Sequence, residues 1–380
     1  MSQPLESEVF VVGGGPAGLA AAIAARLAGF EVALADHCRP PIDKACGEGI
    51  LPGGVAALRR LGVRLDGEEA FALRGIRFTD HGVTAEAKFG AGPALGVRRT
   101  MLHRALVERA GEVGVKLLYG QSVRAAHGTQ IALAGTPVRS RWLVVADGLQ
   151  SRTRGALGLD RISTRSRRVG FRRHYRIEPW SDLVEVLWRP GAQAYVTPVA
   201  RDEVGVALLS DDPELRFAHL ERLFPELSRR LADAAPASRV RGAITVSSRV
   251  ACVARDQVAL IGDASGSVDA ITGDGLSLAF EQSLALGDAL AGGDLSLYAR
   301  AHARICRAPR LVGALLLALA RHDRIRSRAL GVLGSRQWLF DQLLAIHAGE
   351  LPLPGFGADS IAALMRRVTA KAPAAPAGRG

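Results

Sequence analysis

Apolar residues at the start of the chain follow two different periods. Residues 8–12 (EVFVV) and 31–36 (EVALAD) are short apolar runs, and residues 16–30 (PAGLAAAIAARLAGF) between them are rich in alanine. A short apolar run next to turn residues predicts a buried strand, whereas the alanine-rich stretch predicts a helix. Together they predict a strand–helix–strand unit, with which a doubly wound parallel sheet begins.

Later segments repeat or break this pattern. Residues 142–148 (WLVVADG) and 257–263 (QVALIGD) again read as buried strands that end in an acidic turn. Residues 75–90 and most of 161–243 instead alternate between apolar and polar positions, which is typical of antiparallel strands. After residue 276 the apolar spacing is helical to about residue 349.

The fold class that follows is α/β, with a Rossmann-like domain, an inserted antiparallel β-sheet domain, and a helical C-terminal region. The expected parts are residues 1–75, 97–160 and 248–295 for the discontinuous first domain, 76–96 and 161–247 for the inserted sheet, 296–368 for the C-terminal helices, and 369–380 for a disordered Pro/Ala/Gly-rich tail.

The charge of the chain is positive because of arginine. The net charge is +12, and only four of the basic residues are lysines, which leaves 45 arginines. Either an anionic partner or a genomic preference for arginine produces such a balance. No nucleic-acid-binding motif accompanies the charge, so we favour the second explanation and expect no nucleic-acid partner.

Cysteines and hydropathy indicate where the protein resides. The four cysteines form no CxxC pair, so we expect reduced thiols in the cytoplasm and no metal site. The longest apolar run, residues 311–320 (LVGALLLALA), is about half of what a membrane-spanning helix needs. Arginines flank this run within residues 304–328, so two alternatives stay open: a core-packing helix, or peripheral contact with the inner membrane.

The first chemical motif is Gly13-x-Gly15-x-x-Gly18, directly after a predicted strand and at the start of a predicted helix. Its glycines permit a tight turn and close approach of a pyrophosphate to the helix N-terminus. Asp36 ends the next strand, where a carboxylate accepts hydrogen bonds from an adenosine ribose. This set predicts a dinucleotide cofactor without a 2′-phosphate, and it does not separate NAD from FAD.

Two further strand ends make that distinction. The first reads Ala146-Asp147-Gly148, and the second reads Gly262-Asp263-Ala264 before a glycine-rich helix entry. With the glycine fingerprint, these motifs resemble, in order, the flavoprotein superfamily of aromatic hydroxylases related to para-hydroxybenzoate hydroxylase, which also contains the geranylgeranyl reductases. The resemblance runs to about residue 290 and implies an FAD-binding domain of the glutathione-reductase type. A second dinucleotide fingerprint is missing, so NADH or NADPH is expected to bind only transiently as reductant.

The resemblance also implies residue roles. Asp263 contacts the ribityl or ribose hydroxyls, and Asp147 meets both FAD and the nicotinamide donor. Arg99 contacts the pyrophosphate side, with Arg98 as the fallback, and Val123 offers backbone contacts to the adenine. The turn at Gly273 and Gly275 points a helix at the pyrimidine edge of the flavin. The full set of expected cofactor-binding residues is Gly13, Gly15, Pro16, Ala17, Gly18, Asp36, Lys44, Arg99, Val123, Asp147, Gly148, Asp263, Gly273, Asp274, Gly275 and Leu276.

Three residues are candidates for catalysis. Residues 44–49 (KACGEG) resemble the reductase form of a loop that passes over the flavin, which places Cys46 near the ring and makes Glu48 a proton-transfer candidate. Tyr195 lies in residues 190–199 (PGAQAYVTPV), which resemble a strand of the substrate sheet. For each of the three, ordinary packing or a solvated turn is the alternative.

A row of basic side chains precedes that strand. Arg172, His174 and Arg176 share one face of a predicted strand, which suits either an NADPH phosphate or acidic substrate, or a solvated sheet face. We favour the solvated face.

Two reactions fit the resemblance. The first is an NAD(P)H-dependent monooxygenase that uses molecular oxygen, through a flavin C4a-hydroperoxide, to hydroxylate a hydrophobic aromatic or lipid-like natural product. The second is a geranylgeranyl-reductase-like enzyme that reduces a lipid alkene. Gly266 and Ala270 stand where hydroxylases usually carry a histidine and a proline, which favours the second reaction. Residues 194–199 (AYVTPV) lack the tryptophan pattern of many isoprenoid reductases, and the C-terminal helices differ, so we expect the monooxygenase. The protein is expected to be a monomer or homodimer.

Overall fold

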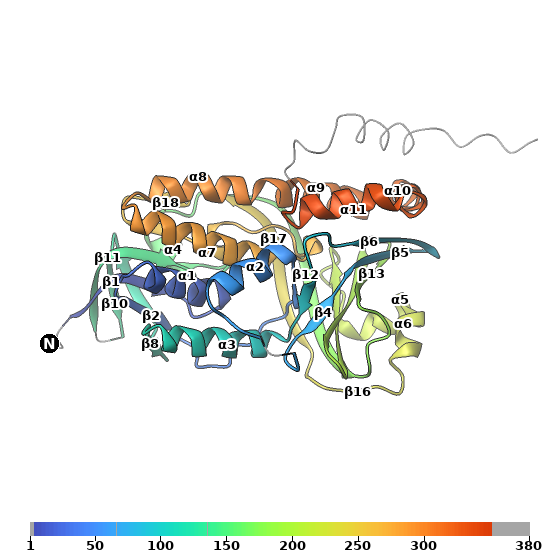
Figure 1. The fold of residues 1–380 in the computed structure, drawn as a ribbon, viewed down its shortest axis with the longest axis horizontal. Helices are drawn as coiled ribbons and strands as arrows, with labels where there is room; N and C mark the ends of the chain where they lie inside the picture. Colours follow the sequence, from blue (N-terminus) through green and yellow to red (C-terminus); the bar gives the residue numbers. More distant parts are fainter. Residues whose placement is uncertain (1–3, 66, 135, 352–380) are drawn as a thin grey trace, which may run out of the picture.

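A computed structural model describes residues 4–65, 67–134 and 136–351 (Figure 1). Its first sheet is built on parallel strands, and the central ones contain runs of consecutive buried residues, as expected when helices or loops cover both faces. In spatial order the strands are β18 (Ala254–Arg255), β19 (Val258–Leu260), β11 (Pro137–Val145), β1 (Leu5–Val12), β2 (Val32–Asp36) and β8 (Lys116–Tyr119), with β10 (Gln130–Leu133) and β9 (Val123–His127) as a hairpin on β11.

Register and packing place the sheet between two layers. Val9 of β1 lies opposite Val32 of β2 and Trp142 of β11 in parallel register. One face packs on helices α1 (Pro16–Leu27), α2 (Pro52–Arg60), α3 (Arg99–Glu112) and α7 (Gly275–Ala291). The other face packs on the β9–β10 hairpin and on the segment after α4 (Arg152–Ala156).

A second sheet lies beside the first (Figure 1). Its strand order is β16 (Ala235–Pro236), β12 (Ile162–Arg176), β15 (Glu203–Ser210), β14 (Ala192–Ala200), β13 (Leu183–Arg189), β5 (Gly75–Asp80) and β6 (Val83–Lys88), with β17 (Arg241–Val250) on β12. The expected antiparallel pairing holds except between β5 and β13, which run parallel because β5 enters from a distant part of the chain.

Short elements complete the two sheets. A small third sheet joins β3 (Gly49–Ile50), β7 (Ala94–Gly96) and β4 (Phe71–Leu73). The short helices α5 (Leu220–Leu223) and α6 (Pro225–Arg230), with the 3₁₀ turn η1 (Phe217–His219), pack on the apolar face of the second sheet. Two more 3₁₀ turns, η2 (Gly262–Ser265) and η3 (Ala270–Thr272), precede α7.

The C-terminal helices extend along both sheets (Figure 1). They are α8 (Leu295–Ile305), α9 (Arg307–Arg321), α10 (Asp323–Ser335) and α11 (Gln337–His347). A fully buried ion pair fixes this layer, because Arg326 of α10 donates to Asp80 of β5 at 3.0 Å. No helix within the described ranges is long and apolar enough to cross a bilayer.

The expected fold class is confirmed: a Rossmann-like domain, an inserted sheet and a helical C-terminal region are all present. The exact domain boundaries stay a prediction. The expected tail at 369–380 and the end of the helical region at 352–368 lie outside the described residues.

Candidate functional site

A cavity of about 910 Å³ lies where the carboxyl ends of the parallel strands face the second sheet. Open α/β sheets bind ligands at this edge. The cavity wall includes most of the predicted cofactor residues, namely Gly13, Gly15, Pro16, Ala17, Asp36, Lys44, Arg99, Val123, Asp147, Gly148, Asp263, Gly273, Asp274, Gly275 and Leu276. The candidates Cys46, Glu48 and Tyr195 line it as well. Their roles stay predictions, but the fold brings them together.

At two positions of the glycine turn after β1, no residue other than glycine fits. A Cβ on Gly13, where φ is +111°, would lie 2.4 Å from the carbonyl oxygen of Ala146. A Cβ on Gly18 would lie 1.8 Å from the carbonyl oxygen of Gly13. Gly18 therefore serves helix–strand packing, while Gly15 faces the cavity, with no atom of the described chain within 4 Å of its Cβ position.

Two hydrogen bonds fix the carboxylate of Asp36 at the end of β2. Its two carboxylate oxygens accept hydrogen bonds from the backbone N–H of Gly14 at 2.6 Å and of Cys38 at 2.7 Å. His103 of α3, which no sequence motif marks, donates from Nε2 to the carbonyl oxygen of Gly14 at 2.9 Å. Burial lowers the pKa of His103, so the ring is a neutral donor that fixes the glycine turn from behind.

The two acidic strand ends differ in their partners. Asp147 accepts a hydrogen bond from the N–H of Thr153 at 3.1 Å through Oδ2, and its buried Oδ1 has no partner within the described ranges. Asp263 forms an ion pair with Lys44 at 3.5 Å across the cavity. Both side chains of this pair are 45 % exposed, so each remains accessible to a ligand.

The segment before α7 forms the other end of the cavity. Gly273 adopts a left-handed conformation with φ +71°, and α7 begins two residues later at Gly275. No described atom lies within 4 Å of a Cβ built at either glycine, so the N-terminus of α7 is open to the cavity. Such an end carries partial positive charge and unpaired N–H groups, which suit an electron-rich ring edge.

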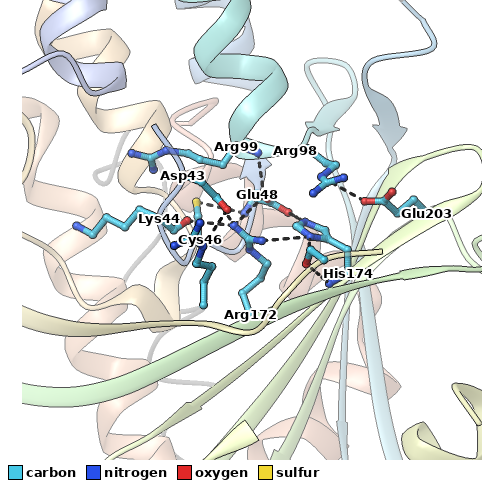
Figure 2. A network of polar contacts seen from close by, with 11 residues as sticks. Asp43, Lys44, Cys46, Glu48, Arg98, Arg99, Arg172, His174 and Glu203 are labelled. Carbon is cyan, nitrogen blue, oxygen red and sulfur yellow. Dashed lines mark hydrogen bonds and ion pairs between the residues drawn. The ribbon is translucent and has the colours of Figure 1, made fainter. Parts of the chain in front are cut away.

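Arg99 and its neighbour Arg98 point in different directions. Arg99 lines the cavity, and its backbone N–H donates to Glu48 at 2.8 Å. The Arg98 guanidinium forms an ion pair with Glu203 of the second sheet at 3.3 Å (Figure 2). Arg98 is absent from the cavity wall, so the wall supports Arg99 and not the fallback.

Glu48 is the centre of a buried polar network (Figure 2). Its carboxylate accepts hydrogen bonds from His174 Nε2 at 2.5 Å and from the backbone of Arg99, and it lies 3.8 Å from Arg172. Arg172 also forms an ion pair with Asp43 at 2.5 Å. Arg172 and His174 are 1 % and 0 % exposed, so the prediction of a solvated face is wrong for both. The reason is that their acidic partners arrive from a distant loop, which an alternating strand pattern cannot reveal.

The same network settles the tautomer of His174. His174 Nδ1 lies 3.2 Å from Arg172 Nη1 and 2.8 Å from the Ser238 hydroxyl. Arg172 can only donate and the hydroxyl can donate as well, so this contact pair fits Nδ1 as the acceptor. Nε2 then carries the proton that it donates to Glu48. Cys46, two residues before Glu48, remains partly accessible and lines the cavity.

Tyr195 joins the second sheet to the segment before α7. Its hydroxyl donates to the carbonyl oxygen of Ile271 at 3.0 Å, and burial raises the pKa of this phenol. Near it, Arg168 forms a buried ion pair with Asp269 at 3.4 Å. These contacts position the glycine turn at residues 273–275 from the side of the second sheet.

The residues present fit FAD. The glycine turn and Asp36 suit a pyrophosphate and an adenosine ribose, Asp263 suits a polyol chain, and the open start of α7 suits a flavin ring edge. The unpartnered Oδ1 of Asp147 is a further acceptor that a bound group can satisfy.

Comparison with known proteins agrees with this site. A protein family described as "FAD binding domain" matches residues 6–293. Menaquinone reductase of Mycobacterium tuberculosis is 30 % identical over 324 residues, which cover 78 % of this chain and 79 % of that protein. Digeranylgeranylglycerophospholipid reductase 1 of Methanopyrus kandleri is 29 % identical over 297 residues, covering 72 % and 78 %. The structure of p-nitrophenol 4-monooxygenase PnpA from Pseudomonas putida superposes with a TM-score of 0.74 at 19 % identity, covering 92 % of this chain and all of that one.

Proposed function

Because the chain belongs to the FAD-binding domain family, we propose that it is an FAD-dependent oxidoreductase that reduces a carbon–carbon double bond of an isoprenoid- or quinone-like lipid. The observation that carries this proposal is similarity over about three quarters of the chain to two enzymes named as reductases, one of menaquinone and one of a digeranylgeranyl lipid. The monooxygenase expected from the sequence becomes the second candidate.

The substrate side of the cavity supports a hydrophobic substrate. Its second-sheet wall carries apolar side chains, and the charged residue of that wall, Arg172, is already paired with Asp43 and lies 3.8 Å from Glu48 of the loop before β3. An anionic substrate would compete with Asp43 and Glu48 for Arg172. Burial of a lipid chain against apolar walls contributes about 25 cal/mol for each Å² removed from water.

In this proposal the chain's own residues have three tasks. The glycine turn at residues 13–18 and Asp36 hold one end of the dinucleotide. The ion pair of Lys44 and Asp263 contacts its middle. The Glu48 network holds the loop with Cys46 at the cavity wall, so Glu48 positions the loop and the Cys46 side chain lines the cavity. FAD, when bound, supplies the two-electron transfer between a transient NADH or NADPH donor and the substrate.

Hydroxylation stays the second candidate because the cavity wall also carries Phe171 and Tyr195, which suit an aromatic ring. The shared fold with PnpA accommodates that reaction, although similarity at 19 % identity speaks only for the fold.

One experiment separates the two. Purified protein loaded with FAD is incubated with NADH or NADPH and either a polyprenyl quinone or an alkyl phenol, once under argon and once under ¹⁸O₂. Reduction predicts a product with two added hydrogens under both atmospheres. A product that carries labelled oxygen, formed only under ¹⁸O₂, would replace the reductase by the monooxygenase.

If the substrate is a lipid, the enzyme reaches it at a membrane. Contact between this protein and a membrane surface is therefore part of the same proposal. Of ten exposed large apolar side chains of the described residues, six belong to α8–α11 or directly follow them, among them Leu311, Leu315 and Trp338. Exposed arginines such as Arg324 and Arg328 accompany them. Sedimentation with vesicles that contain anionic lipid tests the contact, and protein that stays in the supernatant at physiological salt contradicts it.

A further inference from the structure

Two cavities meet at Asp274. The second cavity, of about 360 Å³, lies between α7, the α8–α9 junction and the end of α11. Leu51, Asp274 and His347 line both cavities. Asp274 is only 2 % exposed and directly precedes α7, so its side chain stands at the boundary between the cofactor cavity and a second opening.

The hydrogen bonds around Asp274 indicate a protonated carboxyl. The Thr272 hydroxyl lies 2.9 Å from the carbonyl oxygen of Asp269 and 2.6 Å from Asp274 Oδ1. A hydroxyl has one proton, and a carbonyl oxygen can only accept it. When the hydroxyl proton goes to Asp269, Asp274 must donate the 2.6 Å bond as a neutral acid. When it goes to Asp274, the Asp269 carbonyl oxygen still accepts from the Thr272 backbone N–H at 3.1 Å, so the second oxygen of Asp274 decides between the two.

The other oxygen of Asp274 supports the same state. Oδ2 is buried and has no hydrogen-bond partner in the described part of the chain, so an ionised carboxylate would leave charge on an unsatisfied atom. Burial raises the pKa of Asp274, and nearby His347 and the hydrogen bonds of the carboxyl, including the one with Thr272, oppose that shift only in part. A neutral acid is the form that this environment tolerates.

The second cavity carries groups that can exchange a proton with solvent. Burial raises the pKa of Glu281 on α7, and so does the charge of Asp274 once Asp274 has lost its proton; together they bring it to about 7, which suits exchange at neutral pH. His347 of α11 donates from Nε2 to the carbonyl oxygen of Thr272 at 2.9 Å, and its buried Nδ1 has no partner within the described ranges. The remaining titratable or charged groups at this cavity or facing it are Arg304, Arg307 and Cys306.

We propose that Asp274 holds a proton for the reaction in the cofactor cavity and that the second cavity, through Glu281, restores it from solvent. The inference rests on the proposed reduction, whose balance requires it. Saturating a double bond consumes two electrons and two protons, and a reduced nicotinamide supplies both electrons with only one proton. The second proton comes from Asp274, which becomes ionised and is reprotonated by way of Glu281.

Infrared spectroscopy of the FAD-loaded protein tests the protonation state without an activity measurement. At pH 8.5 Glu281 is largely ionised, so a carboxylic-acid C=O band sensitive to D₂O is expected in the wild type, kept in Glu281→Gln, and lost in Asp274→Asn. Thr272→Val removes the acceptor of the acid proton and is expected to move the band to higher wavenumber. This second variant keeps the test valid if Asp274→Asn does not fold. Equal spectra for the wild type and Asp274→Asn, or an unmoved band in Thr272→Val, overturn the proposal.

The route is tested by the rate of exchange. Glu281→Gln is expected to slow the H/D exchange of the Asp274 band severalfold, and an unchanged rate overturns the route. Neither readout depends on turnover. A failed alkene-reduction assay with an intact band would therefore count against the proposed function and not against the protonated Asp274.

Discussion

Glu48→Gln is the change that tests the buried network most directly. The substitution keeps the size of the side chain and removes its charge. Glu48 accepts from two donors, the Arg99 N–H at 2.8 Å and His174 Nε2 at 2.5 Å. A glutamine has only one oxygen to offer, so its NH₂ group must face one of these donors. If His174 changes tautomer, its Nδ1 can donate to the Ser238 hydroxyl at 2.8 Å, but the same proton then also faces Arg172 Nη1 at 3.2 Å, which leaves Arg172 without this acceptor.

The energetic cost follows from the donor that is left unpaired. One buried donor without an acceptor costs about 1–3 kcal/mol. Removing one partner of a buried ion pair costs about 3–5 kcal/mol, but Asp43 still neutralises Arg172, so the full figure does not apply here. We expect Glu48→Gln to lower the free energy of unfolding by about 2–4 kcal/mol, a large part of the 5–15 kcal/mol typical of folded proteins.

Urea unfolding followed by circular dichroism measures this loss, and flavin absorbance after gel filtration measures retention of FAD. The matched control is Glu86→Gln, because Glu86 pairs with Arg77 at 2.6 Å but is 39 % exposed. Exposed pairs contribute about 0–1 kcal/mol. If the two variants lose the same stability, the buried network around Glu48 stabilises the fold no more than an exposed ion pair does, and its unpaired donor carries no penalty.

Three further changes have defined outcomes. Gly18→Ala would place a Cβ 1.8 Å from the carbonyl oxygen of Gly13, so we expect loss of bound FAD, measured by absorbance after gel filtration. Burial lowers the pKa of His302 from 6.5 to about 4. The stabilising effect of the neutral ring is therefore complete above pH 6.5, and about 3 kcal/mol of the free energy of unfolding is lost as the pH falls towards 4. His302→Gln should flatten this decline when unfolding is measured across acid pH. Glu281 has the opposite sign, because its pKa rises from 4.5 to about 7: its effect is complete below pH 4.5 and lost as the pH rises through 7. Glu281→Gln should therefore raise the melting temperature at pH 8, and an unchanged value would show that Glu281 ionises freely.

The sequence predicts those parts of the site whose signals are local. The glycine turn, Asp36 and the two acidic strand ends each lie within one strand–turn–helix segment, where spacing and residue type reflect backbone geometry. The topology of parallel strands then brings their carboxyl ends to one edge, so residues from three distant segments line one cavity. For this reason the order of motifs along the chain is enough to predict which segments line this cavity, while the role of each residue towards a cofactor stays a prediction.

The polar network was not predictable in the same way. His174 and Glu48 are 126 positions apart, and the alternation of basic residues in β12 looks the same whether that face meets water or a buried carboxylate. His103 gave no signal either, because a histidine in an otherwise ordinary helix does not reveal that its ring will reach the carbonyl oxygen of Gly14. Arg98 and Arg99 are adjacent and chemically identical, and only the direction of α3 separates them.

Contacts between the two sheets couple movement of the second sheet to the walls of the cavity. The second sheet holds the cofactor side at two separate places: His174 of β12 binds the loop at Glu48, and Tyr195 of β14 binds the segment before α7 through Ile271. Glu48 has a φ of +60°, a conformation that a glutamate adopts only at a cost of about 1–3 kcal/mol, so the loop keeps this shape because the network holds it. Gly205 of β15 leaves room for the Glu48 side chain, because a Cβ at this position would lie 3.2 Å from Glu48 Oε2. A ligand that shifts β12 or β14 must therefore also shift the loop at Glu48 or the segment before α7, and both of these line the cavity.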